Sequence, residues 1–137
     1  MSDALPPMSA DEPAVDYDAI LRANAKRVFG EADPVSRLAA LKELWSPDGQ
    51  LIEPDHVYAG IEAISESIGV LLTSLPPGTS FNPLDPAAGH HGLGCLRWQA
   101  QDGSGATLPV SGTDVALIEN GRIIRLYTLF KQLGTIN

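Results

Sequence analysis

Apolar residues recur every three or four positions in three stretches of the N-terminal half of the chain. The stretches run from Val15 to Phe29, from Pro34 to Trp45 and from Gly60 to Ser74. This spacing matches the period of an α-helix and predicts three amphipathic helices. Gly30 is suited to end the first helix, and Asp33 followed by proline is suited to begin the second.

The pattern changes to short alternating segments after Pro76-Pro77-Gly78. The predicted strands are 50–53, before Pro54, and then Thr79–Pro83, Gly92–Gln101, Ala106–Ile118 and Arg122–Lys131. Asp102–Gly105 and Glu119–Gly121 predict hairpin turns, whereas 55–59 and 85–94 predict loops. Helices followed by a run of antiparallel strands indicate an α+β fold.

Composition predicts one domain with a core of its own. The chain has 137 residues, of which 44% are apolar. Residues 1–13 hold three prolines and several acids, which predicts a flexible leader before a single domain over 14–137. Cys95 is the single cysteine, so the chain has no disulfide within it, and a buried structural thiol is the expected role.

Charge disfavours two classes of partner. The formal net charge is −8, with a pI near 4.6, and the nine basic residues are scattered. Nucleic acids and anionic membrane surfaces require clustered Lys and Arg, so neither is expected as a partner. The chain does not start with a secretory signal, and no apolar run approaches about 18 residues, so we expect a cytoplasmic protein without a membrane span.

Several local patterns follow one another in order: Trp45–Asp48, Leu51–Pro54, Tyr58–Ile64, Leu96–Trp98, Gly112–Leu117, Glu119–Ile123 and Leu129-Phe130. Over residues 15–131 they resemble the SnoaL-like polyketide cyclase and ketosteroid isomerase-related branch of the nuclear transport factor 2-like superfamily. The resemblance implies three N-terminal helices packed on a strongly bent, mainly antiparallel sheet, which forms a cone with an internal pocket. The superfamily hosts isomerases, cyclases and plain binding proteins, so the fold alone does not give the function.

Two acids occupy positions where the resemblance implies catalytic carboxyls. Glu53 precedes a proline, as the isomerase general base does, and Asp114 follows Gly112-Thr, where that family keeps an acid. The residues around Asp114 are apolar, so burial should raise the pKa of its carboxyl toward neutrality. His56, in the loop at the expected pocket rim, is a third candidate for proton transfer. The structural alternatives are a hydrogen-bonded core carboxyl for Asp114 and solvent-facing side chains for Glu53 and His56.

The register of the last hairpin decides which way Asp114 points. A two-residue turn at Asn120-Gly121 would place Asp114 opposite Tyr127. A three-residue turn that includes Glu119 would place it opposite Leu126, and the resemblance favours this register.

On that register the pocket face collects residues from several elements. The expected pocket-lining residues are Trp45, Tyr58, Trp98, Ile124, Leu126, Thr128 and Phe130. The outer face would carry Thr113, Val115, Leu117, Arg125, Tyr127 and Leu129, which is too apolar to face water. A homodimer through this face is therefore expected, as the superfamily commonly forms.

The sequence also departs from the isomerase pattern. The tyrosine phenol of that family would fall near Ala25, so its oxyanion hole is not reproduced. His90 and His91 are adjacent and should point apart in an extended chain, which makes them poor joint ligands, and no metal site is expected. Phosphate-loop, dinucleotide and G-x-S-x-G motifs are missing, so no cofactor is expected.

The leading hypothesis is a pocket that binds a small hydrophobic or carbonyl-bearing molecule. Asp114, either alone or together with Glu53, would move a proton during isomerisation or aldol-type cyclisation. The alternatives are a non-catalytic binding module with the same pocket and a dimerisation scaffold with a filled core.

Overall fold

The computed structural model describes residues 14–132, so the leader expected at 1–13 lies outside the described residues. The elements follow in the order α1 (Tyr17–Ala23), η1 (Asn24–Phe29), α2 (Pro34–Leu44), β1 (Trp45–Glu53), β2 (His56–Ala59), α3 (Ile61–Thr73), β3 (Ser80–Pro83), β4 (Ala88–His90), β5 (Leu93–Gln101), β6 (Thr107–Glu119) and β7 (Arg122–Gln132).

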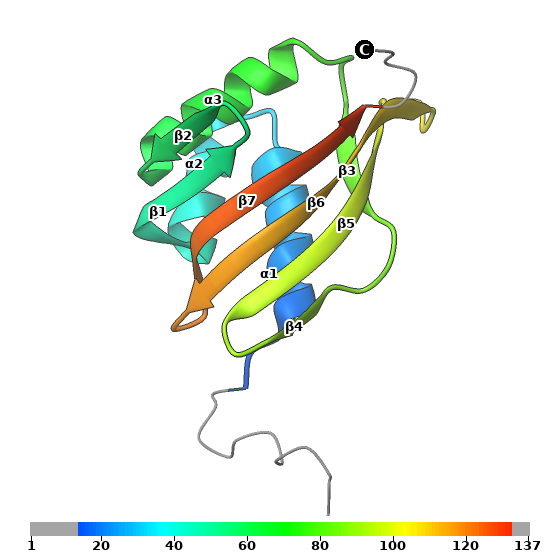
Figure 1. Ribbon diagram of the computed structural model, residues 1–137. Coiled ribbons are helices and arrows are strands. Elements are labelled where there is room, and N and C mark those ends of the chain that lie inside the picture. The colour runs from blue at the N-terminus through cyan, green and yellow to red at the C-terminus, as the bar shows by residue number, and fades with distance from the viewer. Residues whose placement is uncertain (1–13, 133–137) are drawn as a thin grey trace, which may run out of the picture.

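The helices pack together on one face of a strongly curved sheet (Figure 1). The strand order is β2-β1-β7-β6-β5-β3, and β4 pairs with β5 off this path. Neighbouring strands are antiparallel except for β1 and β7, which run parallel. The sheet is mixed and open, and the α+β prediction is confirmed.

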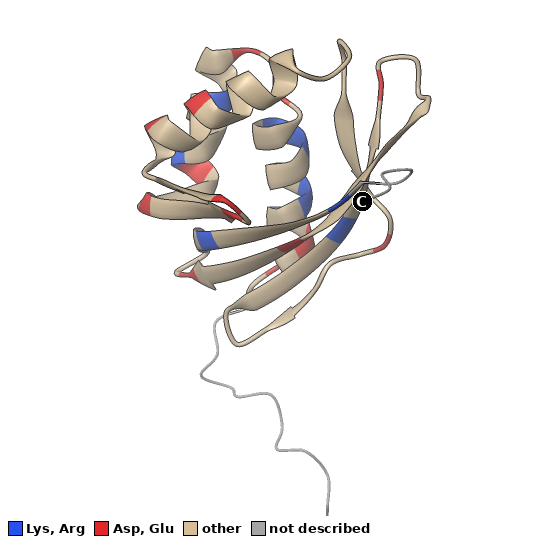
Figure 2. Ribbon diagram, turned by 45° about the horizontal axis from the view of Figure 1, so that its top comes forward, with Lys and Arg blue, Asp and Glu red and all other residues tan. Residues whose placement is uncertain are grey.

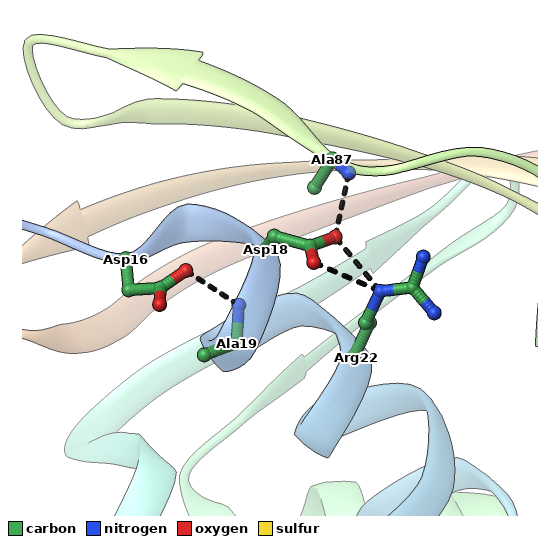
Figure 3. Close-up of polar contacts among 5 residues, drawn as sticks. All are labelled: Asp16, Asp18, Ala19, Arg22 and Ala87. Atoms are coloured by element: carbon green, nitrogen blue, oxygen red, sulfur yellow. Dashed lines mark hydrogen bonds and ion pairs between the residues drawn. The ribbon is translucent and has the colours of Figure 1, made fainter.

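The start of α1 is fixed by two carboxylates (Figure 3). Asp16 caps the helix by accepting from the backbone N–H of Ala19 at 2.9 Å. Asp18 forms an ion pair with Arg22 and accepts from the backbone N–H of Ala87 at 2.7 Å, and this backbone bond is the main reason that the pKa of Asp18 is lowered. These contacts tie the first helix to the segment before β4.

The first predicted helix is continuous in space but changes its winding. From Asn24 the helix widens into the π-helix η1, and the N–H of Gly30 donates to the carbonyl of Ala25, five residues back. Asn24, Ala25 and Phe29 are all buried along this turn. π-helical turns are rare and often lie at functional sites.

The first strand is longer than the sequence predicts. Trp45, expected at the end of the second helix, has extended backbone angles (φ −115°, ψ 152°) and begins β1. The expected loop 55–59 folds back as β2 and pairs antiparallel with the end of β1. The expected loop 85–94 likewise contains β4.

The register of the last hairpin differs from both expectations. Asn120-Gly121 forms a two-residue turn with positive φ at both residues, but Ile124 is then skipped in the pairing with β6. This bulge shifts the register by one residue, so Asp114 pairs with Thr128 instead of Tyr127 or Leu126. The shift still places Thr128 and Phe130 on the Asp114 side, whereas Ile124 is the bulge residue.

The core lies between the helices and the inner face of the sheet. Its largest fully buried side chains include Trp45, Leu21, Leu41, Leu51, Ile64, Ile68, Leu96, Ile123 and Leu126. Most positions of the central strands are uncharged (Figure 2). Within residues 14–132, no helix is long and apolar enough to cross a membrane.

Candidate functional site

A small cavity lies between the helices and the inner face of the sheet, with a carboxyl in its wall. Its lining residues are Ala25, Phe29, Leu71, Phe81, Trp98, Asp114, Thr128 and Phe130. The space open to the centre of a water molecule is about 10 Å³, which is about what a single water needs. In this conformation the cone is therefore nearly filled by side chains.

Asp114 lies in the middle of β6 and points to the inner face of the sheet. Its side chain is buried, with 4% of the residue exposed, and one carboxyl oxygen accepts from the indole N–H of Trp98 at 3.0 Å. Burial raises the pKa of Asp114 to about 7, against smaller lowering effects of Trp98 and Thr128. A carboxyl with this pKa can both give and accept a proton near neutral pH.

Thr128 faces Asp114 directly across the β6–β7 pair. Only 3% of Thr128 is exposed. Its hydroxyl lowers the pKa of the carboxyl, as an O–H directed at a carboxylate does, and it has no other hydrogen-bond partner. The carboxyl and the hydroxyl therefore form one polar pair in an otherwise apolar cavity wall.

Four aromatic rings line the cavity together with the carboxyl and form a chain of edge-to-face contacts. Phe29 and Phe81 are 6.3 Å apart between ring centroids, Phe81 and Trp98 are 5.2 Å apart, and Trp98 and Phe130 are 6.2 Å apart. Phe130 is 44% exposed, so it forms the rim of the cavity, while the other rings are buried. The walls are thus aromatic and mostly dry.

Gly112 makes room for this arrangement on β6. A methyl group added at its Cα would collide with the indole ring of Trp98 and with the carbonyl of Leu129. The absence of a side chain at this position lets Trp98 lie against the sheet, from where its N–H reaches Asp114. Glycine in a strand often marks such a close approach.

The other two candidate acid–base residues lie in a separate polar cluster. Glu53 ends β1 and pairs with His56, the first residue of β2, and neither is among the residues that line the cavity. Glu53 is half-buried, and its pKa is raised by desolvation and by the charge of Asp55, while His56 lowers it. The His56 ring lies against Tyr58, 4.4 Å between centroids. The structure therefore does not bring Glu53 together with Asp114 in the cavity.

Of the seven residues expected to line the pocket, three line the cavity and four do not. Trp98, Thr128 and Phe130 line the cavity, whereas Ile124, Leu126, Trp45 and Tyr58 do not. Trp45 is fully buried, and its indole N–H donates to the side-chain oxygen of Asn24 at 2.8 Å. The Asn24 amide nitrogen has no hydrogen-bond partner. This buried pair fixes η1 against β1.

Four lining residues were not predicted from the sequence. They are Ala25, Phe29, Leu71 and Phe81. Ala25 stands near the place of the isomerase phenol, and this correspondence was the one available signal. Leu71 was expected only as part of a helix stripe, and the π-helical turn that carries Phe29 into the cavity leaves no clear sequence pattern.

The adjacent histidines approach each other more closely than an extended chain would allow. His91 has a positive φ of 49°, and the Nδ1 atoms of His90 and His91 lie 3.0 Å apart. Within residues 14–132, no three His, Cys, Asp or Glu side chains gather as metal ligands would. Cys95 is only partly buried on β5, less than the sequence led us to expect.

A larger hollow lies on the surface between α2 and α3. This open groove has a volume of about 560 Å³, and Leu38 and Val70 are among its lining residues. Arg37 is buried in its wall, where Nε donates to the hydroxyl of Ser65 at 3.0 Å and Nη1 donates to the carbonyl of Glu31 at 2.7 Å. These bonds hold α2 to α3 and to the loop before α2. Asp114, whose carboxyl has a pKa near neutrality, lies in the inner cavity and not in this groove.

Neither protein-family models nor curated proteins match this chain, but solved structures do. A candidate isomerase of the SnoaL-like family from Agrobacterium tumefaciens superimposes with a TM-score of 0.77 at 20% identity, over 85% of this chain and 97% of that one. The chain has the SnoaL-like fold. A candidate SnoaL-like polyketide cyclase from Jannaschia shares the fold with a TM-score of 0.67 at 12% identity, over 90% and 91% of the two chains.

A third similar structure comes from Catenulispora acidiphila. It is described as having a ketosteroid isomerase-like fold, and its structure is a complex with trimethylamine. It superimposes with a TM-score of 0.61 at 12% identity, over 80% of this chain and 82% of that one. At identities this low the likeness establishes the fold, and function has to be argued from the site.

Proposed function

We propose that this chain is a SnoaL-like protein that binds a small, mostly apolar molecule in the Asp114 cavity and exchanges a proton with it. The observation that carries the proposal is the buried carboxyl of Asp114, whose pKa is raised to about 7. Catalytic acids and bases work best when their pKa lies near the working pH. Isomerisation or aldol-type cyclisation of a carbonyl compound, without a cofactor, is the form of chemistry that we infer.

The surroundings of Asp114 support this role. Trp98 holds one carboxyl oxygen, so the carboxyl cannot rotate freely, and the aromatic walls exclude water from a bound ligand. Two fold neighbours are named as a candidate isomerase and a candidate cyclase, and a third, with a ketosteroid isomerase-like fold, is a complex with the small molecule trimethylamine. Because Glu53 does not line the cavity, the proposed proton transfer rests on Asp114 alone.

Entry of a ligand requires one wall of the cavity to move. The free space of about 10 Å³ is far below that of a typical ligand pocket, which is about 300 Å³ or more. Phe130 is the exposed ring of the wall and lies near the end of β7, so its rotation would open the cavity at the least packing cost. We infer that the ligand is small and that Phe130 turns outward when it binds.

The test is a proton-transfer assay on small β,γ-unsaturated ketones, whose conversion to the conjugated isomer is followed by ultraviolet absorbance. We expect the protein to accelerate at least one member of such a panel over buffer. Asp114→Asn should reduce this rate by about 10²-fold or more, because removal of a general acid–base group typically has that effect. Glu53→Gln is the matched control and should keep the rate. Equal rates for the Asp114→Asn variant and the wild type would remove Asp114 from the reaction.

We also propose a homodimer through the outer face of the sheet. Val115, Leu117, Arg125, Tyr127 and Leu129 project to this side in the observed register. Leu129 is 56% exposed and Tyr127 is 39% exposed, which is unfavourable for side chains of this size on one continuous surface. A second copy of the same face would cover them.

The proposed dimer is tested by light scattering after size-exclusion chromatography. Leu129→Glu should shift the protein from dimer to monomer, because a carboxylate would then be buried without a partner. Val35→Glu is the matched control, since Val35 is 78% exposed on α2, away from the sheet. A monomeric wild-type protein, or a dimer that survives Leu129→Glu, would contradict the proposal.

A further inference from the structure

The cavity beside Asp114 offers hydrogen-bond acceptors but almost no free donors. Asp114 can accept several hydrogen bonds and receives one from Trp98. That bond uses the single N–H of the Trp98 side chain. Thr128 adds a buried hydroxyl whose O–H is directed at the carboxylate and lowers the pKa of Asp114, so its oxygen lone pairs remain for a ligand. The other lining side chains, Ala25, Phe29, Leu71, Phe81 and Phe130, have no polar atoms. A ligand that donates hydrogen bonds therefore suits this wall better than one that only accepts them.

The charge of the cavity wall comes from a single acid. Asp114 is the one titratable side chain among the lining residues, and no Lys, Arg or His lines the cavity with it. Within the described part of the chain, no cationic side chain forms an ion pair with its carboxylate. A buried carboxylate is stable only with a partner, so the ionised form would favour a positively charged ligand.

The aromatic rings of the cavity wall also favour a positively charged ligand. The faces of Phe29, Phe81, Trp98 and Phe130 carry partial negative charge, which attracts cations and repels anions. A cation placed over the face of one of these rings is attracted to it, most strongly where water is excluded. A neutral carbonyl compound gains less from these rings, and its oxygen would take its hydrogen bond from the protonated form of Asp114.

We propose that the molecule entering this cavity carries a small alkylammonium group, which donates N–H to the carboxylate of Asp114 and to the hydroxyl of Thr128 between the aromatic rings. This inference rests on the proposed function in one respect, that the Asp114 cavity takes a ligand. The class comprises small amines with a short apolar body, whether or not they also carry a carbonyl group. The limited space restricts the body to a few carbon atoms and requires Phe130 to turn outward.

The affinities of the two ligand classes should depend differently on pH, and this difference can be measured. An alkylammonium ion keeps its proton to about pH 10, as lysine does, so only Asp114 changes charge between about pH 5.5 and pH 8.5. The cation requires the ionised carboxylate, and with a pKa of about 7 the ionised fraction rises about thirtyfold over this interval. The affinity for the cation should rise about thirtyfold, whereas that for a ketone should stay constant or fall.

The experiment is an NMR titration of the full chain with isobutylammonium chloride and, separately, with 3-methylbutan-2-one, a neutral molecule of similar size. The chain has two tryptophans, so two indole N–H signals are expected. The Trp98 signal reports on the Asp114 carboxyl, and the Trp45 signal, from the bond to Asn24, is the internal reference. We expect isobutylammonium to shift the Trp98 signal at high pH and to leave the Trp45 signal in place.

Three variants assign the effect to the cavity. Asp114→Asn should weaken isobutylammonium binding about tenfold or more, because a charged hydrogen bond is lost. Thr128→Val should weaken it about tenfold, because the charged ammonium group loses one hydrogen-bond acceptor. Glu53→Gln should bind like the wild type, although Glu53 also has a raised pKa, because it does not line the cavity.

Each result decides between the two proposals. Tight ketone binding that depends on Asp114, without binding of the ammonium ion, would overturn this inference and leave the proposed function standing. A Trp98 signal that responds to neither molecule would count against both. If Asp114→Asn does not fold, the pH dependence of the wild type and the Thr128→Val variant still decide, and ammonium affinity that is equal at both pH values overturns the inference.

Discussion

Replacement of Asp114 by asparagine should make the protein more stable at alkaline pH but not at acidic pH. Asparagine has nearly the same shape and can still accept the Trp98 N–H through its side-chain oxygen. It carries no charge at any pH, so it escapes the cost of ionisation in the cavity wall. The comparison of the two proteins therefore isolates the titration of one buried carboxyl.

The magnitude follows from the shift of the Asp114 pKa from its ordinary 3.8 to about 7. Between these values the unfolded chain has lost the proton while the native protein still holds it, so unfolding releases a proton and the free energy of unfolding falls as pH rises. At about 1.4 kcal/mol per pH unit the loss amounts to about 4 kcal/mol. It begins near pH 4 and is complete above about pH 7 to 8.

Urea denaturation of the wild type and Asp114→Asn from about pH 4 to pH 9 checks this reasoning. The difference in the free energy of unfolding should be near zero at the acidic end and should favour the variant by up to about 4 kcal/mol at the alkaline end. With a typical slope of about 2 kcal/mol per molar urea, the midpoint of the variant would be higher by about 2 M. Other groups titrate in the same range, Glu53 among them, but they cancel in the difference. A difference that does not change with pH would refute the raised pKa of Asp114.

Three further outcomes follow from the contacts around the site. Trp98→Phe removes the hydrogen bond that lowers the pKa of Asp114, so NMR titration of the carboxyl should place that pKa above about 7. Trp45→Phe leaves the fully buried side-chain oxygen of Asn24 without a donor, and urea denaturation should show a loss of about 1–3 kcal/mol. Gly112→Ala forces a methyl group against the Trp98 ring and should cost about 1–3 kcal/mol by the same measurement. It should also shift the Trp98 indole N–H signal, and an unchanged signal would show that the ring does not rest on Gly112.

Much of the fold could be predicted from local patterns in the sequence. The helix period, the Asp33-Pro34 start of α2 and the hairpin turns were predictable because each depends on residues that are neighbours in the sequence. The apolar surroundings of Asp114 in the sequence likewise predicted that its carboxyl would be buried. These predictions required no knowledge of which segments meet in space.

The register of the last hairpin depended on the folded chain as a whole. Asn120-Gly121 specifies a two-residue turn, but the bulge at Ile124 forms three residues after the turn and moves Thr128 opposite Asp114. A bulge is selected by packing against both faces of the sheet, and no local residue pattern marks it. The side of the sheet that Thr128 and Phe130 occupy was predicted correctly, although the pairing assumed for it was wrong.

The sequence by itself determined that a buried acid lies in an apolar strand of a SnoaL-like fold. Only the tertiary structure decided which side chains meet that acid. Phe29 lies in the cavity wall because it belongs to a π-helical turn, and Phe81 lies there because it belongs to a short edge strand. Glu53 lies in a separate cluster. The physical reason is that burial of a residue is set largely by its own strand or helix pattern, while the composition of a cavity depends on the relative placement of elements far apart in the chain. That placement is fixed by packing of the whole core.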